Sequence, residues 1–221
     1  MAGFTERWPE IVSANPGGSD DPLGESVLLP EAPNVRVFEP RDTRLVLGRG
    51  QDPERELQVA AAQADGIPIH RRIAGGGAVV LAPGMVVVAL RLPRIPGNAD
   101  CTFGVVNACL IPAIAQATGV IPVCRGHGDL AIETDAGTRK ILGSSLRQQR
   151  DLAIYLAVLL VDDAVPLMER YLAAPSREPD YRAGRGHAAF CTHLGAHGGT
   201  VASLRSALAE ACQQTFGVDA A

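Results

Sequence analysis

Two stretches of the sequence combine cationic side chains with glycines. The first is Arg71-Arg72-Ile73-Ala74-Gly75-Gly76-Gly77-Ala78-Val79, and the second is Arg139-Lys140-Ile141-Leu142-Gly143-Ser144-Ser145. Three adjacent residues without a Cβ let the backbone approach a ligand closely, with N–H groups free to bind an anion. Guanidinium groups offer planar donors that suit phosphate or carboxylate. The pair of stretches predicts an anion-binding site, although each alone also fits a glycine-rich hairpin with solvated cations.

A third stretch, Cys124-Arg125-Gly126-His127-Gly128-Asp129-Leu130, contains a possible nucleophile. A cysteine acts as a nucleophile in its thiolate form, and neighbouring cations such as Arg125 and His127 favour that form. A free cysteine also serves as a small apolar residue at the end of a strand. Both interpretations of Cys124 stay open at this point.

Composition narrows the class of protein. The chain has 221 residues, a hydrophobic fraction of 47%, a charged fraction of 20% and a formal net charge of -4. An acidic balance argues against general nucleic-acid binding. We see no signal peptide and no apolar run long enough to span a bilayer. The five cysteines are odd in number and lack CxxC spacing, which favours free thiols in a reducing cytoplasm over a disulfide framework. We therefore expect a cytoplasmic protein without membrane or nucleic-acid partners.

The elements that position these residues can be predicted from apolar periodicity and from Gly and Pro. Residues 1–33 read as a loop-rich extension with a short helix near 4–12, and 175–193 as a long polar loop. We expect strands over 34–38, 44–48, 68–73, 79–82, 85–92, 120–124, 129–134 and 151–161, with a further strand from 139. We expect helices over 54–66, 103–118, 165–172 and 201–216. Hairpins interrupted by a few helices indicate an α+β fold, here a single domain over 1–221.

Four segments in order resemble the lipoate–protein ligase family, which belongs to a larger class with biotin ligases and octanoyltransferases. They are Gly48-Arg49-Gly50-Gln51-Asp52-Pro53, the Arg71–Val79 stretch, Gly128-Asp129-Leu130 and the Arg139–Ser145 stretch. The resemblance covers about residues 44–172 and implies that family's catalytic domain. Its fold has mixed and antiparallel β-sheets flanked by helices.

The resemblance also implies a reaction. Lipoate or octanoate would react with ATP, accompanied by Mg²⁺, to give an acyl-AMP. The acyl group would then pass to a lysine of a lipoyl-carrier protein, either a lipoyl domain or a protein like the glycine-cleavage H protein. An acyl-adenylate carries an anionic phosphate beside a reactive carbonyl, so its site needs fixed cationic donors. Lys140 is the expected catalytic cation, and Asp129 would hold magnesium or orient Lys140. The acyl-adenylate would be bound by Arg71, Arg72, Gly75, Gly76, Gly77, Ala78, Val79, Asp129, Gly143, Ser144 and Arg185.

Several departures from the family pattern keep alternatives open. After Val79 the ligases commonly continue with an aromatic residue, His and Asp, whereas this chain has Val80-Leu81-Ala82-Pro83-Gly84. We expect no C-terminal accessory domain, which some relatives supply as a separate polypeptide. The first alternative is an ATP-independent octanoyl or lipoyl transferase that uses a thioester on Cys124. The second is a non-catalytic lipoyl-binding subunit.

Overall fold

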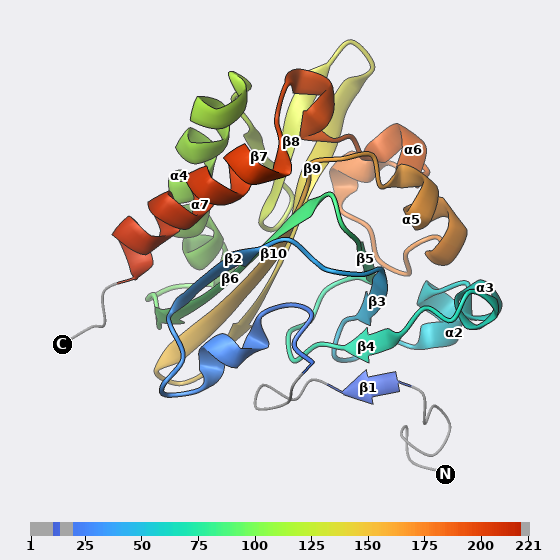
Figure 1. The fold of residues 1–221 in the computed structure, drawn as a ribbon, viewed down its shortest axis with the longest axis horizontal. Coiled ribbons are helices and arrows are strands. Elements are labelled where there is room, and N and C mark those ends of the chain that lie inside the picture. Colours follow the sequence, from blue (N-terminus) through green and yellow to red (C-terminus); the bar gives the residue numbers. More distant parts are fainter. Residues whose placement is uncertain (1–10, 14–19, 218–221) are drawn as a thin grey trace.

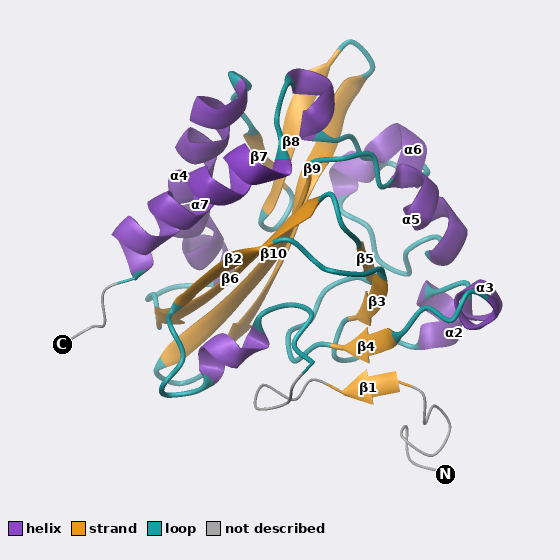
Figure 2. Ribbon diagram, viewed as in Figure 1, coloured by secondary structure: helices purple, strands orange, loops and turns teal. Residues whose placement is uncertain are grey.

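Two β-sheets form the centre of the computed structural model, which describes residues 11–13 and 20–217 (Figures 1 and 2). The six-stranded sheet has the order β2-β6-β10-β9-β8-β7, and every neighbouring pair is antiparallel. Its strands are β2 (Val35–Phe38), β6 (Met85–Pro93), β7 (Val123–Arg125), β8 (Asp129–Thr134), β9 (Gly137–Gln148) and β10 (Leu152–Leu160). This antiparallel sheet, flanked by helices, confirms the predicted α+β class.

The smaller sheet has four strands in the order β1-β4-β3-β5. They are β1 (Ile11–Ser13), β3 (Arg44–Leu47), β4 (Ile69–Arg71) and β5 (Val79–Leu81). Strand β4 pairs in parallel with both β1 and β3, and β5 pairs antiparallel with β3. The predicted helix near 4–12 lies outside the described residues, except that Ile11 and Val12 are in β1.

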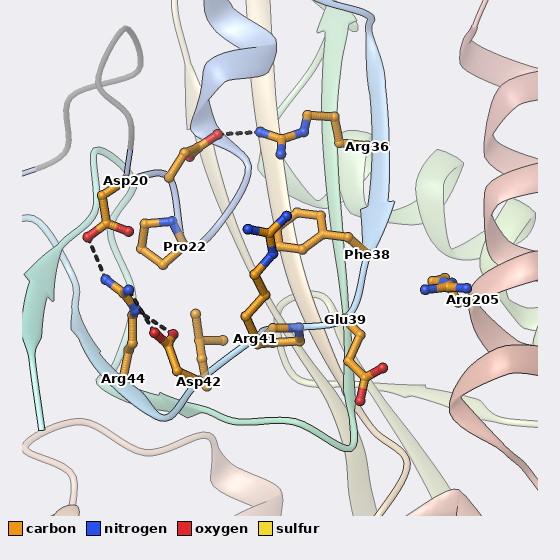
Figure 3. A pocket seen from close by; sticks show the side chains of 12 residues that line it. Asp20, Pro22, Arg36, Phe38, Glu39, Arg41, Asp42, Arg44 and Arg205 are labelled. Atoms are coloured by element: carbon orange, nitrogen blue, oxygen red, sulfur yellow. Dashed lines mark hydrogen bonds and ion pairs between the residues drawn. The ribbon is translucent and has the colours of Figure 1, made fainter.

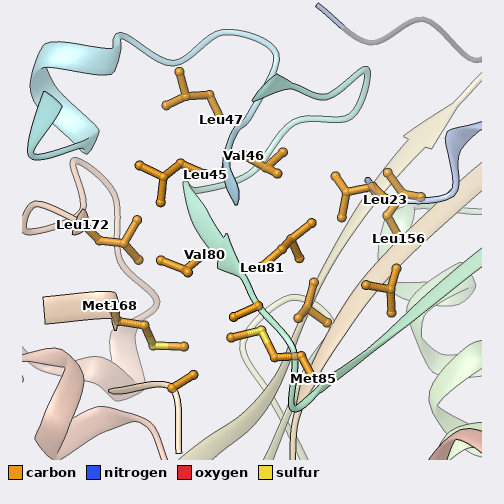
Figure 4. Packing of buried hydrophobic residues seen from close by; sticks show 14 of the residues in the cluster. Leu23, Leu45, Val46, Leu47, Val80, Leu81, Met85, Leu156, Met168 and Leu172 are labelled. Atoms are coloured by element: carbon orange, nitrogen blue, oxygen red, sulfur yellow. The ribbon is translucent and has the colours of Figure 1, made fainter. Parts of the chain in front are cut away.

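The six-stranded sheet is buried on both faces, which explains the long apolar runs of β6 and β10. Successive side chains of a strand point to opposite faces. Val86, Val88 and Leu90 accordingly join one buried cluster, while Met85 and Val87 join another. We call the cluster between the two sheets the inner core (Figure 4). The cluster between the six-stranded sheet and the helices α4 (Ala99–Thr118) and α7 (Val201–Phe216) is the outer core.

Helices α4 (Ala99–Thr118) and α7 (Val201–Phe216) cover the outer core and pack against each other (Figure 1). The Asn98 side chain caps α4, which ends at Gly119 in the left-handed region with φ of 74°. Thr200 caps α7 by accepting from the Ser203 N–H at 3.1 Å. The helix predicted over 201–216 is confirmed, and its residues Leu204, Leu208 and Cys212, at positions i, i+4 and i+8, are all buried as one apolar face.

Helix α4 is also long and apolar enough, by length and composition, to cross a membrane. The expectation that no segment meets this criterion does not hold for α4. In the structure Phe103, Val106, Leu110 and Ile114 of this helix are buried in the outer core. Packing against the sheet therefore accounts for the apolar character of this side of the helix.

Short helices complete the fold: α2 (Pro53–Glu56), α3 (Val59–Ala64), α5 (Val165–Tyr171) and α6 (His187–Phe190). There are also 3₁₀ helices η1 (Glu25–Leu28), η2 (Asp180–Arg182) and η3 (Leu194–His197). The helix predicted over 54–66 is wrong in one respect, because it breaks at Leu57 and Gln58. Leu57 forms a bridge with Leu172, and the Gln58 N–H donates to the Tyr171 carbonyl at 2.8 Å. The segment predicted as the long loop 175–193 contains η2 and α6.

Candidate active site

An ion pair between two neighbouring strands lies at the centre of the candidate site. The Lys140 Nζ atom on β9 is 2.8 Å from Asp129 Oδ1 on β8. The Lys140 side chain is 24% exposed and that of Asp129 is 11% exposed, so the pair is largely buried. A partly buried cation at a fixed position is what a reaction that develops negative charge requires.

A β-bulge decides which way Lys140 points. Leu130 pairs with Leu142 and Ala131 pairs with Lys140, so Ile141 is an extra residue in the register. Two residues of a bulged strand oppose one residue of its partner. Ile141 and Leu142 are accordingly both buried in the outer core. The bulge thus places Lys140 and Gly143, three residues apart, on the opposite face of the sheet.

Gly143 leaves the room that the lysine head occupies. A Cβ at this position would be 2.9 Å from both Cε and Nζ of Lys140 and 4.0 Å from Asp129 Oδ1. The Lys140 side chain therefore lies back along its own strand, over Gly143, to reach the carboxylate. This contact explains physically why a glycine follows the basic pair in this block.

The second oxygen of Asp129 is also engaged. The Tyr181 hydroxyl in η2 donates to Asp129 Oδ2 at 2.9 Å. Burial, reinforced by the Asp129 charge, raises the pKa of the Tyr181 phenol, which therefore stays a neutral donor. Lys140 is fixed through its main chain as well, because its carbonyl accepts from the Thr192 N–H at 2.9 Å.

The triple glycine forms a loop between β4 and β5, and Arg72 holds this loop from inside. The Arg72 Nη2 atom donates to the Gly75 carbonyl at 2.7 Å and to the Gly77 carbonyl at 2.8 Å. The side chain is buried, and burial lowers the Arg72 pKa to about 10. We expected its donors to face an anionic ligand. The structure instead directs them to the loop, so any contact of Arg72 with an adenylate stays a prediction.

Groups from other elements hold the outside of this glycine loop, residues 73–77. The Ile73 N–H donates to Glu25 Oε1 at 2.8 Å, and the Ile73 carbonyl accepts from Arg147 at 3.2 Å. Glu25 is buried, and desolvation raises its pKa to about 7. Ala74 accepts from the Arg49 N–H at 3.0 Å. These contacts from several elements hold the loop in one conformation.

The turn at Gly48 lies directly against the glycine loop. A Cβ on Gly48 would be 2.0 Å from the Gly76 carbonyl oxygen, so only glycine fits between the two backbones. Arg71 joins them further by donating to the carbonyls of Gly48 at 2.9 Å and Arg49 at 3.1 Å. The turn that begins at Gly48 and the triple-glycine loop are therefore packed together as one unit.

The glycine loop and Lys140 share one face of β9. A Cβ at Gly76 would be 3.6 Å from the Ser145 Cβ, so the loop lies over Ser145. Ser145 and Gly143 point to the same side of the strand because they are two residues apart. The lysine head over Gly143 and the loop over Ser145 are then about 7 Å apart along the strand. The fold thus brings together the two basic, glycine-containing stretches.

Other predicted residues lie elsewhere around this site. Ser144 points to the opposite face, where its hydroxyl donates to the Gly128 carbonyl at 2.7 Å, and Ser145 faces the glycine loop instead. Ala78 and Val79 are half-buried and pack against the inner core. Arg185 donates to the carbonyls of Tyr181 at 2.7 Å and Thr138 at 2.9 Å, which ties η2 to β9.

Cys124 lies on the other side of the sheet from Lys140. It pairs with Leu130, an outer-core residue, and its Sγ accepts from Asn107 Nδ2 of α4 at 3.5 Å. Arg125 forms an ion pair with Glu133 at 2.8 Å, and His127 with Asp100 at 2.9 Å. The two cations expected to favour a thiolate thus have carboxylate partners.

Among the described residues, no cluster of metal-binding side chains accompanies Asp129 to support a magnesium site. Across residues 11–13 and 20–217, no group of three or more His, Cys, Asp or Glu side chains could hold a metal ion. Both Asp129 oxygens already have partners, one of them a cation. We therefore assign no metal ligand, and the magnesium role of Asp129 stays a prediction.

Two residues of this site, Glu25 and Tyr181, were not predicted from the sequence, because they are far along the chain from the residues they contact and belong to no recognisable motif. The sequence does contain one further signal for Lys140. Lys140 is the only lysine among the 20 Lys and Arg residues of the chain. Arginine fills the other 19 of these positions, so a side-chain ammonium group is present only here.

A separate hollow of about 620 Å³ lies at the start of β3, near α7 (Figure 3). Several of its charged side chains are paired with each other, including Arg44 with Asp42 at 2.7 Å and Arg36 with Asp21. None of the predicted site residues lines this hollow. It is therefore distinct from the candidate active site.

Comparison with known proteins extends the resemblance. The family model of the lipoyl protein ligase A/B catalytic domain matches residues 20–216. A bipartite lipoate protein ligase from Thermoplasma acidophilum, described together with its E2 lipoyl domain, superimposes with a TM-score of 0.71. Its identity is 19%, over 84% of this chain and 71% of that chain.

Two further structures have a similar fold. A lipoate-protein ligase A bound with ATP gives a TM-score of 0.67 at 18% identity, over 84% of this chain and 73% of that chain. A Thermoplasma acidophilum protein with bound lipoic acid gives 0.65 at 17% identity, also over 84% and 73%. At these identities the likeness concerns the fold.

Proposed function

The chain belongs to the lipoyl protein ligase A/B catalytic-domain family, and we propose that it is a lipoate–protein ligase. It would activate lipoate or octanoate with ATP and transfer the acyl group to a lysine of a lipoyl-carrier protein. The observation that carries this proposal is the Lys140 ammonium group, which Asp129 holds on the same face of β9 as the glycine loop.

In the first half-reaction the acyl carboxylate attacks the α-phosphorus of ATP. A bond from oxygen to phosphorus forms, the bond to the β-phosphate breaks, and pyrophosphate leaves. Negative charge grows on the oxygens around the α-phosphorus, and the Lys140 ammonium group stabilises this charge. The N–H groups of the glycine loop contribute fixed dipoles on the same face of the strand. Magnesium would accompany the phosphates of ATP without an assigned protein ligand.

In the second half-reaction the carrier lysine attacks the acyl carbonyl. A carbon–nitrogen bond forms, the carbon–oxygen bond to AMP breaks, and the amine proton passes to solvent. Lys140 again faces the developing oxyanion. Half-buried Ile73, Ala78 and Val79 at the rim of the inner core offer apolar contacts to an eight-carbon chain. Each buried CH₂ is worth about 0.8 kcal/mol.

The test is intact-mass spectrometry of a lipoyl-domain acceptor incubated with the protein and lipoate. Reactions are run with and without ATP and Mg²⁺, beside Lys140→Ala and Lys140→Arg. We expect a lipoyl mass gain that requires ATP and is lost in both variants, because guanidinium lacks the compact shape that fits over Gly143. Adenylate formation without transfer would indicate that a separate accessory polypeptide is needed, as in a bipartite enzyme.

The thioester alternative is disfavoured by the position of Cys124 on the face opposite Lys140. It is tested in the same assay with an octanoylated carrier as donor, no ATP, and Cys124→Ser. Transfer that leaves an acyl adduct on Cys124 and is lost in this variant would replace the ligase proposal. Ligand binding without any acyl intermediate would support a non-catalytic subunit.

A further inference from the structure

Tyr181 is connected to Lys140 through Asp129. The Tyr181 hydroxyl donates to Oδ2 of Asp129 at 2.9 Å, and Oδ1 of the same carboxylate is 2.8 Å from Lys140 Nζ. A carboxylate held by one partner can rotate about its Cβ–Cγ bond, whereas partners on both oxygens fix its plane. The phenol therefore helps to determine where Oδ1 lies.

The tyrosine is itself held in place. Its ring lies 4.9 Å from the Phe190 ring, and the guanidinium groups of Arg182 and Arg185 stack over Phe190 at 4.9 and 5.3 Å. The Tyr181 carbonyl accepts from Arg185, which also donates to Thr138 on β9. The hydroxyl is thus anchored to the strand that carries Lys140.

We propose that Tyr181 is a positioning residue, which acts through Asp129 to fix the Lys140 ammonium group. This inference rests on the proposed function for its catalytic meaning, but its physical content can be measured without any turnover. Since Lys140 is the only lysine, an amine-directed reagent can modify one side-chain amine, with the N-terminal amine as internal reference.

The first experiment is trace labelling with acetic anhydride, read by peptide mass spectrometry. Tyr181→Phe keeps the ring stack and removes only the hydroxyl. We expect acetylation of Lys140 to become about three- to ten-fold faster, because a carboxylate that has lost the phenol holds the ammonium group less firmly. The increase is limited because Tyr181 acts on Lys140 only indirectly, through Asp129. The matched control is Tyr171→Phe, because the Tyr171 hydroxyl also donates to a carboxylate, Asp65 Oδ2 at 2.8 Å. The control should leave the Lys140 rate unchanged.

The second experiment asks whether the effect passes through Asp129. Tyr181→Phe is combined with Asp129→Ala and labelled in the same way. If Tyr181 acts through the carboxylate, it changes the Lys140 rate only when Asp129 is present, and the two changes are non-additive. Equal effects of Tyr181→Phe in both backgrounds would overturn the proposal. The proposal would also be overturned if Tyr181→Phe alone melted at the wild-type temperature and left the rate of Lys140 acetylation unchanged.

Kinetics then connect positioning to the reaction. In adenylate formation, measured as pyrophosphate release, we expect Tyr181→Phe to lower kcat by about ten-fold with little change in KM for ATP, since misplacement acts on the transition state. A rise in KM alone would show that Tyr181 contributes to binding and would overturn the positioning role. If neither the wild-type protein nor any variant forms adenylate, the proposed function fails. The labelling result still decides whether Tyr181 positions Lys140.

Discussion

Lys140 is distinguished by the shape of the space it fills. Its head lies between the backbone of Gly143 and the Asp129 carboxylate, where a Cβ on Gly143 would be only 2.9 Å from it. An ammonium group is a compact charge on a flexible stem, whereas a guanidinium group is broad and planar. The narrow space between Gly143 and Asp129 explains why this position has the one lysine of the chain, whereas the other 19 basic residues are arginines.

We predict that Gly143→Ala displaces the lysine without unfolding the protein. The atoms in the way are the far end of a flexible side chain, which can move. Adenylate formation should fall by about 10- to 100-fold, because small displacements of a catalytic group are costly. The free energy of unfolding should change by less than about 1 kcal/mol.

Pyrophosphate release and urea unfolding measure the two quantities. The control is Gly104→Ala on α4, where a Cβ meets nothing within 4 Å. That variant should keep full activity, and it should be slightly more stable because Ala favours helix over Gly. A fully active Gly143→Ala protein would contradict the assignment of Lys140.

At the scale of elements, the glycine loop depends on contacts from separate parts of the chain. The β3–α2 turn touches it at Gly48, η1 holds it through Glu25, and β9 contributes Arg147. Arg72 fills its interior. Such a loop exposes backbone to a ligand while keeping one conformation, which reduces the ordering cost of binding.

We predict that Gly48→Ala disrupts this arrangement. The added Cβ would be 2.0 Å from the Gly76 carbonyl oxygen, a backbone atom that can move only with its loop. Stability should fall by about 1–3 kcal/mol, as expected for overpacking. Adenylate formation should fall as well, since the shifted loop no longer faces Lys140.

Urea unfolding and pyrophosphate release test this prediction together. Gly50→Ala in the same turn is the matched control for stability, because a Cβ there meets nothing within 4 Å. Equal stability of the two variants would show that the backbone contact between the turn and the loop is unimportant.

At the scale of the whole molecule, the six-stranded sheet separates two hydrophobic cores that pack against different elements. The outer core carries α4 and α7, and the inner core joins the two sheets beside the glycine loop. Glu25 is buried there as an acid whose pKa is raised from 4.5 to about 7 by desolvation. Such a group makes global stability depend on pH.

The sign follows from proton binding. Between about pH 4.5 and 7 the folded state retains a proton on Glu25 that the unfolded state has released. The free energy of unfolding therefore falls as the pH rises through this window, by up to about 3 kcal/mol from this group. Glu25→Gln keeps an acceptor for the Ile73 N–H and removes the titration.

Urea unfolding at pH 5, 6, 7 and 8 compares the two proteins. The stability of Glu25→Gln relative to wild type should increase from pH 5 to 8. Histidines and thiols that titrate in the same range are common to both proteins and cancel in the difference. Parallel stability profiles would contradict an ionisation of buried Glu25 in this range.

The sequence by itself determined the α+β class, most helices and strands, and the family resemblance. These follow from local signals: apolar periodicity, the positions of Gly and Pro, and motifs with fixed spacing. Local patterns also pointed to Lys140 and the triple glycine as candidate site residues. Each of these features depends on residues close together in the chain.

Only the tertiary structure decided which of those residues meet. The bulge at Ile141 turns Lys140 to the face of Gly143, and the same alternation places Ser144 and Cys124 on the opposite face. One extra residue reverses the faces of a strand without an apparent signal in local composition. Glu25 and Tyr181 reach the site only through long-range packing, as do the donors of Arg72 that hold the loop. Local periodicity cannot encode such contacts, because they depend on how distant segments pack together.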